Sequence, residues 1–183
     1  NTATVTITGT LTESELNTLV DGLAYKNTSD DPTAADRVVT LESIKDDGGT
    51  TNSGSNETTS LSISSTATVT AVNDAPTLTA AGSDPTFAEG DGSAAGLFSS
   101  SAVDVVESGQ NVSELVLTVT NVTDGAAEVL VVDGSDVELT DSTSVNTTNT
   151  TANVSVTSNT ATVTITGTLT ESELNTLVDG LAY

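Results

Sequence analysis

Apolar and polar residues alternate strictly along the first positions of the chain. Thr occupies every even position from Thr2 to Thr10. The apolar residues of this stretch all occupy odd positions: Ala3, Val5, Ile7 and Leu11. A period of two is typical of a β-strand with one buried side and one solvent-facing side. The pattern therefore predicts a strand over residues 2–11.

The period changes at Thr12, where a helix is predicted to begin. Thr12 and Glu15 have the spacing of a capping box, in which each side chain accepts a hydrogen bond from the other residue's backbone N–H. Gly22 suits the C-terminus of a helix. The apolar residues after the cap have helical spacing: Leu16, Leu19, Val20 and Leu23. We therefore expect one short helix or turn, laid across the edge of a sheet.

Further strands are predicted over short apolar or alternating runs that are separated by turn residues. These runs are 37–44, 60–72, 114–120, 127–132, 137–140, 152–156 and 160–166. Ser158 and Asn159 lie between two of them and predict a hairpin. Many short strands with regular turns are typical of a β-sandwich. The predicted fold class is all-β, as an Ig-like sandwich with one short helix per repeat.

The chain also repeats itself. Residues 1–25 and 159–183 are identical, at an offset of 158 positions. Such identity indicates a tandem array, of which this chain holds a little more than one period. Asn73–Pro76 (NDAP) combines a turn former with a proline and marks the predicted boundary. We expect residues 1–74 to be the C-terminal part of one repeat and residues 75–183 the N-terminal part of the next.

The two parts are complementary in this interpretation. Residues 75–183 lack equivalents of the strands 37–44 and 60–72, so neither part closes a sandwich alone. We expect neighbouring repeats to be partners, and residues 26–72 of one molecule to complete residues 76–183 of another. This contact predicts a head-to-tail association of chains. The duplicated residues then compete for one place, and one copy is expected to be displaced, disordered or paired elsewhere.

Composition narrows the range of partners. The chain has 26 acidic residues against Lys26, Arg37 and Lys45, with a formal net charge of −23. Nucleic acid and anionic membranes are not expected to bind, because phosphate groups are bound by clustered Lys and Arg. No run is apolar enough for direct membrane insertion, and the absence of Cys excludes disulfides. The acidic excess leaves two interpretations: a solvated, salt-tolerant surface, or carboxylate clusters neutralised by divalent cations.

One stretch carries a family resemblance. Residues 37–78 read RVVTLESIKDDGGTTNSGSNETTSLSISSTATVTAVNDAPTL, which is a strand, an acidic turn, a polar loop, a long alternating strand and an Asn-Asp-Ala-Pro linker. This order resembles the C-terminal half of a cadherin-like domain, and in particular the cadherin-like extender repeats of giant RTX-type adhesins. Residues 11–41 and 102–119 resemble other segments of those repeats. The resemblance implies a protein on the surface of a Gram-negative bacterium, exported by type I secretion.

The resemblance also implies Ca²⁺ at the junctions between repeats. Calcium takes six to eight oxygen ligands, so several carboxylates and carbonyls must converge. The candidate ligands are Asn73 and Asp74 in the linker, Glu89 and Asp91 after it, Asp104 and Glu107 near the next strand, Asp46 and Asp47 in the Asp-Gly-Gly turn, and Asp30 and Asp31 beside the helix. Asp and Asn also favour turns for backbone reasons alone, so a solvated turn residue is the alternative at each position.

Two features depart from the family. Ala71 and Val72 stand where a cadherin linker has a further acidic residue. The Gly-Gly-x-Gly-x-Asp nonapeptide of RTX β-rolls does not occur in the chain. If the resemblance holds, this part of the protein is a spacer and not a β-roll.

The remaining function classes are weighed by chemistry. We do not expect an enzyme, because His and Cys are absent and paired carboxylates lack the aromatic platforms that bind sugars. The Thr ladder of residues 2–12 is compatible with an ice-binding face, but Thr is also a favoured solvent-facing strand residue. The predicted function is a structural spacer stiffened by calcium. The alternative is a calcium-binding cadherin-like module that mediates adhesion directly, against which the scarcity of aromatic residues argues.

Overall fold

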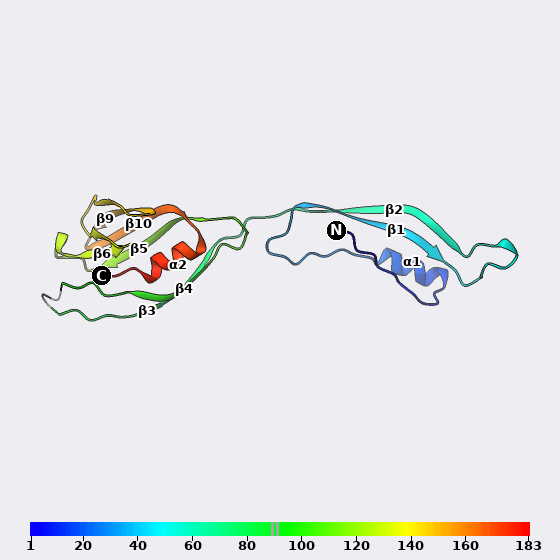
Figure 1. Ribbon diagram of the computed structural model, residues 1–183, viewed down its shortest axis with the longest axis horizontal. Coiled ribbons are helices and arrows are strands. Elements are labelled where there is room, and N and C mark those ends of the chain that lie inside the picture. Colours follow the sequence, from blue (N-terminus) through cyan, green and yellow to red (C-terminus); the bar gives the residue numbers. More distant parts are fainter. Residues whose placement is uncertain (89, 91) are drawn as a thin grey trace. The chain divides into compact units, whose positions relative to one another are not determined.

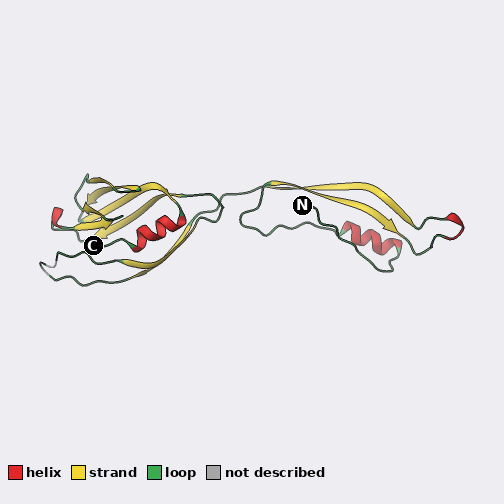
Figure 2. Cartoon of the chain, in the orientation of Figure 1, coloured by secondary structure: helices red, strands yellow, loops and turns green. Residues whose placement is uncertain are grey.

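The computed structural model describes residues 1–88, 90 and 92–183. The protein is mostly β-strand, arranged in several sheets with two short α-helices (Figure 1, Figure 2). This confirms the predicted all-β class. The chain divides into two compact units, which we call unit 1 (Asn1–Ala71) and unit 2 (Val72–Tyr183).

Unit 1 consists of one helix and one hairpin. Helix α1 spans Glu13–Asp21. Strands β1 (Ala35–Lys45) and β2 (Glu57–Val69) pair antiparallel, and a short 3-10 helix (Thr51–Ser53) lies in their connection. No described side chain of unit 1 belongs to the buried hydrophobic core. Its large apolar side chains, including Val38 of β1, are therefore largely in contact with solvent.

Helix α1 is specified by local interactions. The Thr12 hydroxyl accepts a hydrogen bond from Glu15 N–H at 3.4 Å, and Glu15 Oε2 accepts one from Thr12 N–H at 2.8 Å. At the other end, Gly22 N–H donates to the carbonyls of Thr18 and Leu19. The predicted helix and its capping box are confirmed. The helix forms without burying any of its residues.

A four-stranded antiparallel sheet lies at the centre of unit 2. Its order is β5–β10–β9–β8, with β5 at Val112–Thr120, β8 at Ser144–Asn146, β9 at Thr150–Thr157 and β10 at Thr160–Leu169. Ser158 and Asn159 join β9 to β10 with φ of 50° and 61°. Positive φ at both residues is what a type I′ hairpin turn requires. The predicted hairpin is confirmed.

Two further strand pairs and a second helix complete unit 2. Strand β3 (Thr77–Gly82) pairs with β4 (Phe98–Asp104), β6 (Val129–Val132) pairs with β7 (Ser135–Glu138), a 3-10 helix (Gly125–Ala127) precedes β6, and α2 spans Glu171–Asp179. The described core lies wholly in unit 2. Its most completely buried large side chains are Leu130, Val132, Val137, Leu139, Val163, Ile165 and Leu181.

Helix α2 runs along one edge of β4 and caps its backbone (Figure 2). Three N–H groups spaced two residues apart, two on β4 and one directly after its end, donate to three side chains spaced four residues apart on α2. The pairs are Ser101 with Asp179, Val103 with Asn175, and Val105 with Glu171, each at 2.9 Å. Two strand residues advance about 6.6 Å and four helical residues about 6 Å, so the two spacings match. We call Glu171, Asn175 and Asp179 the acceptor stripe of α2.

The first copy of the duplicated sequence does not form the predicted strand. Residues 1–11 contain no strand, whereas the identical residues at the other end form β10. Val5 is 82% exposed, while its counterpart Val163 is 0% exposed. Strand β10 is hydrogen-bonded to β5 on one side and to β9 on the other. The prediction was wrong for the first copy because an alternating pattern supplies one apolar face but no partner for the backbone.

The other strand predictions vary in accuracy. The predicted runs 37–44, 114–120 and 152–156 lie inside β1, β5 and β9. The runs 60–72 and 137–140 are displaced by three and two residues from β2 and β7, and 127–132 begins two residues before β6. Strands β3, β4 and β8 were not predicted. Their sequences, TLTAAG, FSSSAVD and SVN, contain few large apolar residues, so their pairing is decided by tertiary context.

Candidate functional site

The NDAP linker is hydrogen-bonded to the loop that follows β4. Asp74 N–H donates to Oε1 of Glu107 at 2.5 Å. Nε2 of Gln110 donates to Oδ1 of Asn73 at 2.6 Å. The structure therefore brings three of the predicted ligands, Asn73, Asp74 and Glu107, into one place. The contact of Asp74 is made by its backbone.

The Glu107 carboxylate is only half satisfied. Its Oε1 accepts the Asp74 hydrogen bond, but its Oε2 is buried and has no hydrogen-bond partner among the described residues. A buried carboxylate oxygen without a donor is costly, and such groups are rare in folded proteins. This oxygen is the feature of the linker site that points to a ligand.

An open hollow of about 350 Å³ adjoins Glu107. It is lined by residues 105–111 together with Thr170 and Glu171 at the start of α2. Oε1 of Glu171 accepts a hydrogen bond from Val105 N–H, so this carboxylate also holds the loop. Glu171 was not predicted as part of the site. The recurrence of Glu171, Asn175 and Asp179 at intervals of four is the signal in the sequence that would have placed it beside a strand.

Asp104 has a local role in the same loop. Its Oδ1 accepts a hydrogen bond from Val106 N–H at 2.8 Å. Val106 has φ of 67°, in the left-handed region that β-branched residues rarely adopt. The Asp104 carboxylate therefore stabilises a strained turn. The interpretation of Asp104 as a turn residue, which was the alternative to a metal ligand, has direct support here.

The other described candidates belong to unit 1. Oδ1 of Asp46 accepts a hydrogen bond from Gly48 N–H at 2.8 Å, which closes the Asp-Gly-Gly turn. Asp47 lies next to it, and Asp30 and Asp31 lie between α1 and β1. None of these four residues belongs to unit 2, which contains the linker.

The predicted ligands Glu89 and Asp91 lie outside the described residues. Within residues 1–88, 90 and 92–183, no three or more Asp or Glu side chains are grouped so as to hold a metal ion. The candidate site among these residues is therefore a single orphaned carboxylate oxygen beside the linker, with amide and carbonyl oxygens near it.

The charges are divided unevenly between the two units. Lys26, Arg37 and Lys45 all lie in unit 1, and residues 72–183 contain no Lys, Arg or His. Several carboxylates of unit 2 instead accept hydrogen bonds from backbone N–H groups. Besides Glu107 and the acceptor stripe, Oδ2 of Asp133 accepts from Asn149 N–H at 3.2 Å. These hydrogen bonds satisfy the carboxylate oxygens without cancelling their charge.

A second orphaned oxygen, which was not predicted, belongs to Glu128. Its Oε1 accepts hydrogen bonds from the N–H groups of Thr123 and Asp124, while its Oε2 is buried without a partner among the described residues. The charge of Glu128 acts on the hydroxyl group of Tyr183. Burial, and then the charges of Glu128 and Asp124, raise the pKa of the Tyr183 hydroxyl above its ordinary value.

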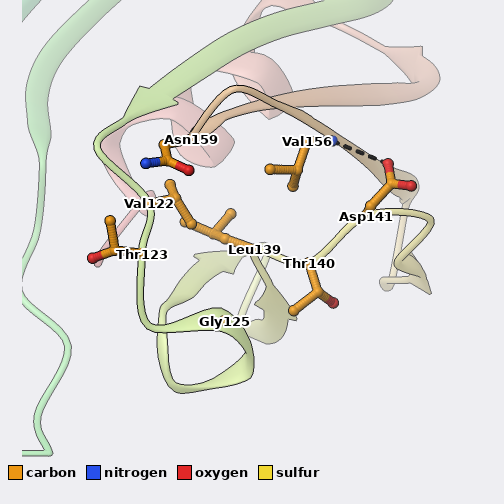
Figure 3. Close-up of a pocket in the computed structure, with 8 residues that line it drawn as sticks. All are labelled: Val122, Thr123, Gly125, Leu139, Thr140, Asp141, Val156 and Asn159. Carbon is orange, nitrogen blue, oxygen red and sulfur yellow. Dashed lines mark hydrogen bonds between the residues drawn. The ribbon is translucent and has the colours of Figure 1, made fainter.

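A larger open hollow, of about 530 Å³, is shown in Figure 3. Val122, Leu139 and Val156 supply its apolar lining. Its one carboxylate, Asp141, accepts a hydrogen bond from Val156 N–H at 3.1 Å (Figure 3). No second titratable side chain lines this hollow. Asp141 therefore has a structural contact in this hollow.

Comparisons with protein-family models, with curated proteins and with solved structures find no match to this chain. The family resemblance therefore rests on the residues and their order alone. Neither helix of the described chain has the length and apolar character needed to cross a membrane.

Proposed function

We propose that this chain belongs to a tandem spacer of a large extracellular adhesin, built from Ig-like, cadherin-like β-sandwiches that calcium stiffens at their junctions. The identical 25-residue segments support a tandem array. The resemblance of residues 37–78 supports the cadherin-like type and, through the family, a Gram-negative cell surface and type I secretion. The spacer holds a terminal binding module away from the cell.

The observation that carries the calcium part of the proposal is the state of Glu107. Its buried Oε2 lacks a hydrogen-bond donor among the described residues, and its Oε1 already binds the linker backbone at Asp74. Calcium is a hard cation that prefers carboxylate, amide and carbonyl oxygens. Glu107, with Asn73 and Asp74 beside it, would hold such an ion, and the remaining ligands would be backbone oxygens and water.

The charge of unit 2 gives an independent reason for a cation. Its carboxylates face no basic side chain within residues 72–183. Like charges around the linker repel one another and favour an open hinge. An ion bound by Glu107 and the linker joins the linker to the folded unit and restricts the hinge. A stiff junction is the mechanical property that a spacer needs.

Thermal unfolding of the full chain with calcium and with excess chelator tests this proposal. An ion that binds only the folded state, at a concentration roughly 100 times its Kd, adds about 2.7 kcal/mol to the free energy of unfolding, so the Tm of unit 2 should rise by about 10 °C. Glu107→Gln should abolish most of this rise. The matched control is Glu114→Gln, which changes an exposed carboxylate on β5 and should leave it intact. Coincident melting curves with calcium and with chelator would remove calcium from the proposal.

A further inference from the structure

Unit 2 contains a defined place for the duplicated sequence. Strand β10 fills the gap between β5 and β9, where Val163 lies opposite Leu117 on one side and Val154 on the other. Helix α2 covers the edge of β4 through its acceptor stripe. We call the gap between β5 and β9 together with this edge of β4 the insert slot. Residues 159–183 occupy it.

The first copy carries the same apolar face but leaves it uncovered. Ile7 is 55% exposed, against 1% for Ile165. Leu23 is 49% exposed, against 2% for Leu181. Because the two sequences are identical, the surface that covers this face is known from unit 2: it is the insert slot.

The first copy also carries the polar side chains with which the second copy binds the insert slot. Glu13, Asn17 and Asp21 repeat the acceptor stripe of α2 on α1, at the same spacing of four residues. Their side chains form no hydrogen bond with other described residues. In α2 the same three side chains accept hydrogen bonds from N–H groups two residues apart, two on β4 and one directly after its end. The stripe of α1 therefore matches the edge of a β4 strand.

We infer that residues 1–25 are a second insert, and that the insert slot of another copy of this chain takes them up. Each chain then carries two inserts and one slot. When the first copy of one molecule enters the slot of a second molecule, it displaces that molecule's own residues 159–183. The contact is heterologous and does not close, so chains join head to tail. This inference does not rest on calcium or on adhesion.

Exchange of one insert for the other gains no apolar burial by itself, because the area that the first copy buries equals the area that the displaced copy exposes. The driving force for the exchange must therefore come from residues outside the inserts. In this chain the hairpin β1–β2 comes directly after the first copy and is carried with it to the second molecule. Its exposed apolar side chains, among them Val38, Ile44 and Ile63, can then be covered by unit 2.

The order of the repeat favours a second molecule over the same one. By the offset of 158, residues 1–71 correspond to the residues that come after position 158 in an array, so units 1 and 2 belong to successive repeats. Strand β2 leads through the linker into β3 of the next repeat. Insertion of the first copy into the slot of its own molecule would require that connection to turn back on the same unit.

Two matched variants of the full chain test the inference by light scattering over a wide range of concentration. Ile165→Asp with Leu177→Asp places charges on the second insert and empties the slot. The weight-average mass of this variant should rise with concentration from 18.3 kDa, the mass of one chain, to twice that value and beyond. Ile7→Asp with Leu19→Asp disables the first insert, and this variant should stay at 18.3 kDa throughout.

Each result other than these overturns the inference. If the slot-emptied variant stays at the mass of one chain, either folded or unfolded by circular dichroism, then the first copy does not enter the slot of a second molecule. If the association persists after Ile7→Asp is added to the same chain, then it does not depend on the first insert. The wild-type chain should associate at higher concentration than the slot-emptied variant, because its slot is already filled.

A third substitution separates specific insertion from general hydrophobic contact. Asn17→Leu on the slot-emptied variant keeps the helix and its apolar face but removes the central member of the stripe. Association should then require about tenfold more protein, the effect of about one hydrogen bond. The matched control is Ser14→Ala, whose counterpart Ser172 is exposed on α2, and it should change nothing. Equal weakening by both substitutions would contradict recognition by the stripe.

Discussion

The same 25 residues occur twice in this protein and fold differently. Residues 13–21 and 171–179 are both helical, with the same capping box. Residues 160–169 form a central strand, whereas the identical residues 2–11 form none. The difference separates what a sequence determines locally from what it determines only in a folded context.

The helix is local because its ends are satisfied by its own residues. Thr12 and Glu15, and likewise Thr170 and Glu173, exchange hydrogen bonds across one turn. The strand is not local, because each of its backbone groups needs a partner on another strand. Only β10 has β5 and β9 beside it. Burial depends on the pairing, and the apolar face of the first copy stays in solvent.

The largest expected contrast between the copies is in the core. Ile165→Ala should destabilise unit 2 by about 2–5 kcal/mol, because it opens a cavity at a fully buried position. Ile7→Ala should change the free energy of unfolding by less than about 0.5 kcal/mol, as for an exposed residue. Urea unfolding of dilute protein measures both. Equal losses would mean that the first copy is buried in solution.

A smaller contrast is expected in the acceptor stripe. Asn175→Leu leaves the partly buried N–H of Val103 without an acceptor, and should cost unit 2 about 1–3 kcal/mol. Asn17→Leu should cost almost nothing, because the Asn17 side chain has no described partner. Urea unfolding and the amide exchange rate of Val103 report the result. Unchanged exchange at Val103 in Asn175→Leu would show that the helix does not cap β4.

Removal of the N-cap should cost both helices a similar free energy but should reduce the helicity of α1 alone. Thr12→Ala and Thr170→Ala each remove a cap worth about 1 kcal/mol. α1 has no buried residue to hold it, so its helicity should fall substantially, which backbone chemical shifts measure. α2 is anchored by Leu174, Leu177 and Val178, so it should stay helical while unit 2 loses stability. A helical α1 in Thr12→Ala would show that tertiary contacts support it.

The smallest expected effect is a pH dependence of the helicity of α1. Hydrogen bonds from the backbone and then the hydroxyl of Thr12 lower the pKa of Glu15 below its ordinary value of 4.5, and Thr170 does the same for Glu173. A lowered folded-state pKa means that the stabilisation is complete above about pH 4.5 and is lost as the pH falls through the lowered value. The helicity of α1 should therefore decrease in acid. Glu15→Gln should remove that decrease. If the helicity of α1 in Glu15→Gln fell with pH as it does in the wild-type chain, this result would contradict the role of the capping box.

Local signals predicted local structure well. The capping box gave α1 and α2, and Ser158-Asn159 gave the β9–β10 turn, because neighbouring residues fix these conformations. The alternating pattern predicted a strand in both copies and was wrong for one of them. Strands β5 and β9 decide which copy is paired. The alternating pattern within each copy contains no information about these two strands.

The candidate site was only partly predictable for the same reason. The turn-forming linker and the acidic loop indicated Asn73, Asp74 and Glu107, and hydrogen bonds join them in the structure. The place of Glu171 beside that loop depends on the packing of α2 against β4. The orphaned oxygens of Glu107 and Glu128 are a property of burial, which the sequence pattern did not indicate.

The most direct test of the difference between the copies uses the four isoleucines of the chain, Ile7, Ile44, Ile63 and Ile165. In dilute protein with labelled isoleucine δ-methyl groups, a soluble paramagnetic agent broadens the NMR signals of exposed methyls. Ile7→Val and Ile165→Val assign the two signals of interest. We predict that the Ile165 signal is protected and that those of Ile7, Ile44 and Ile63 are broadened. Protection of Ile7 and Ile165 to the same degree would contradict the claim that only one copy of the sequence is paired.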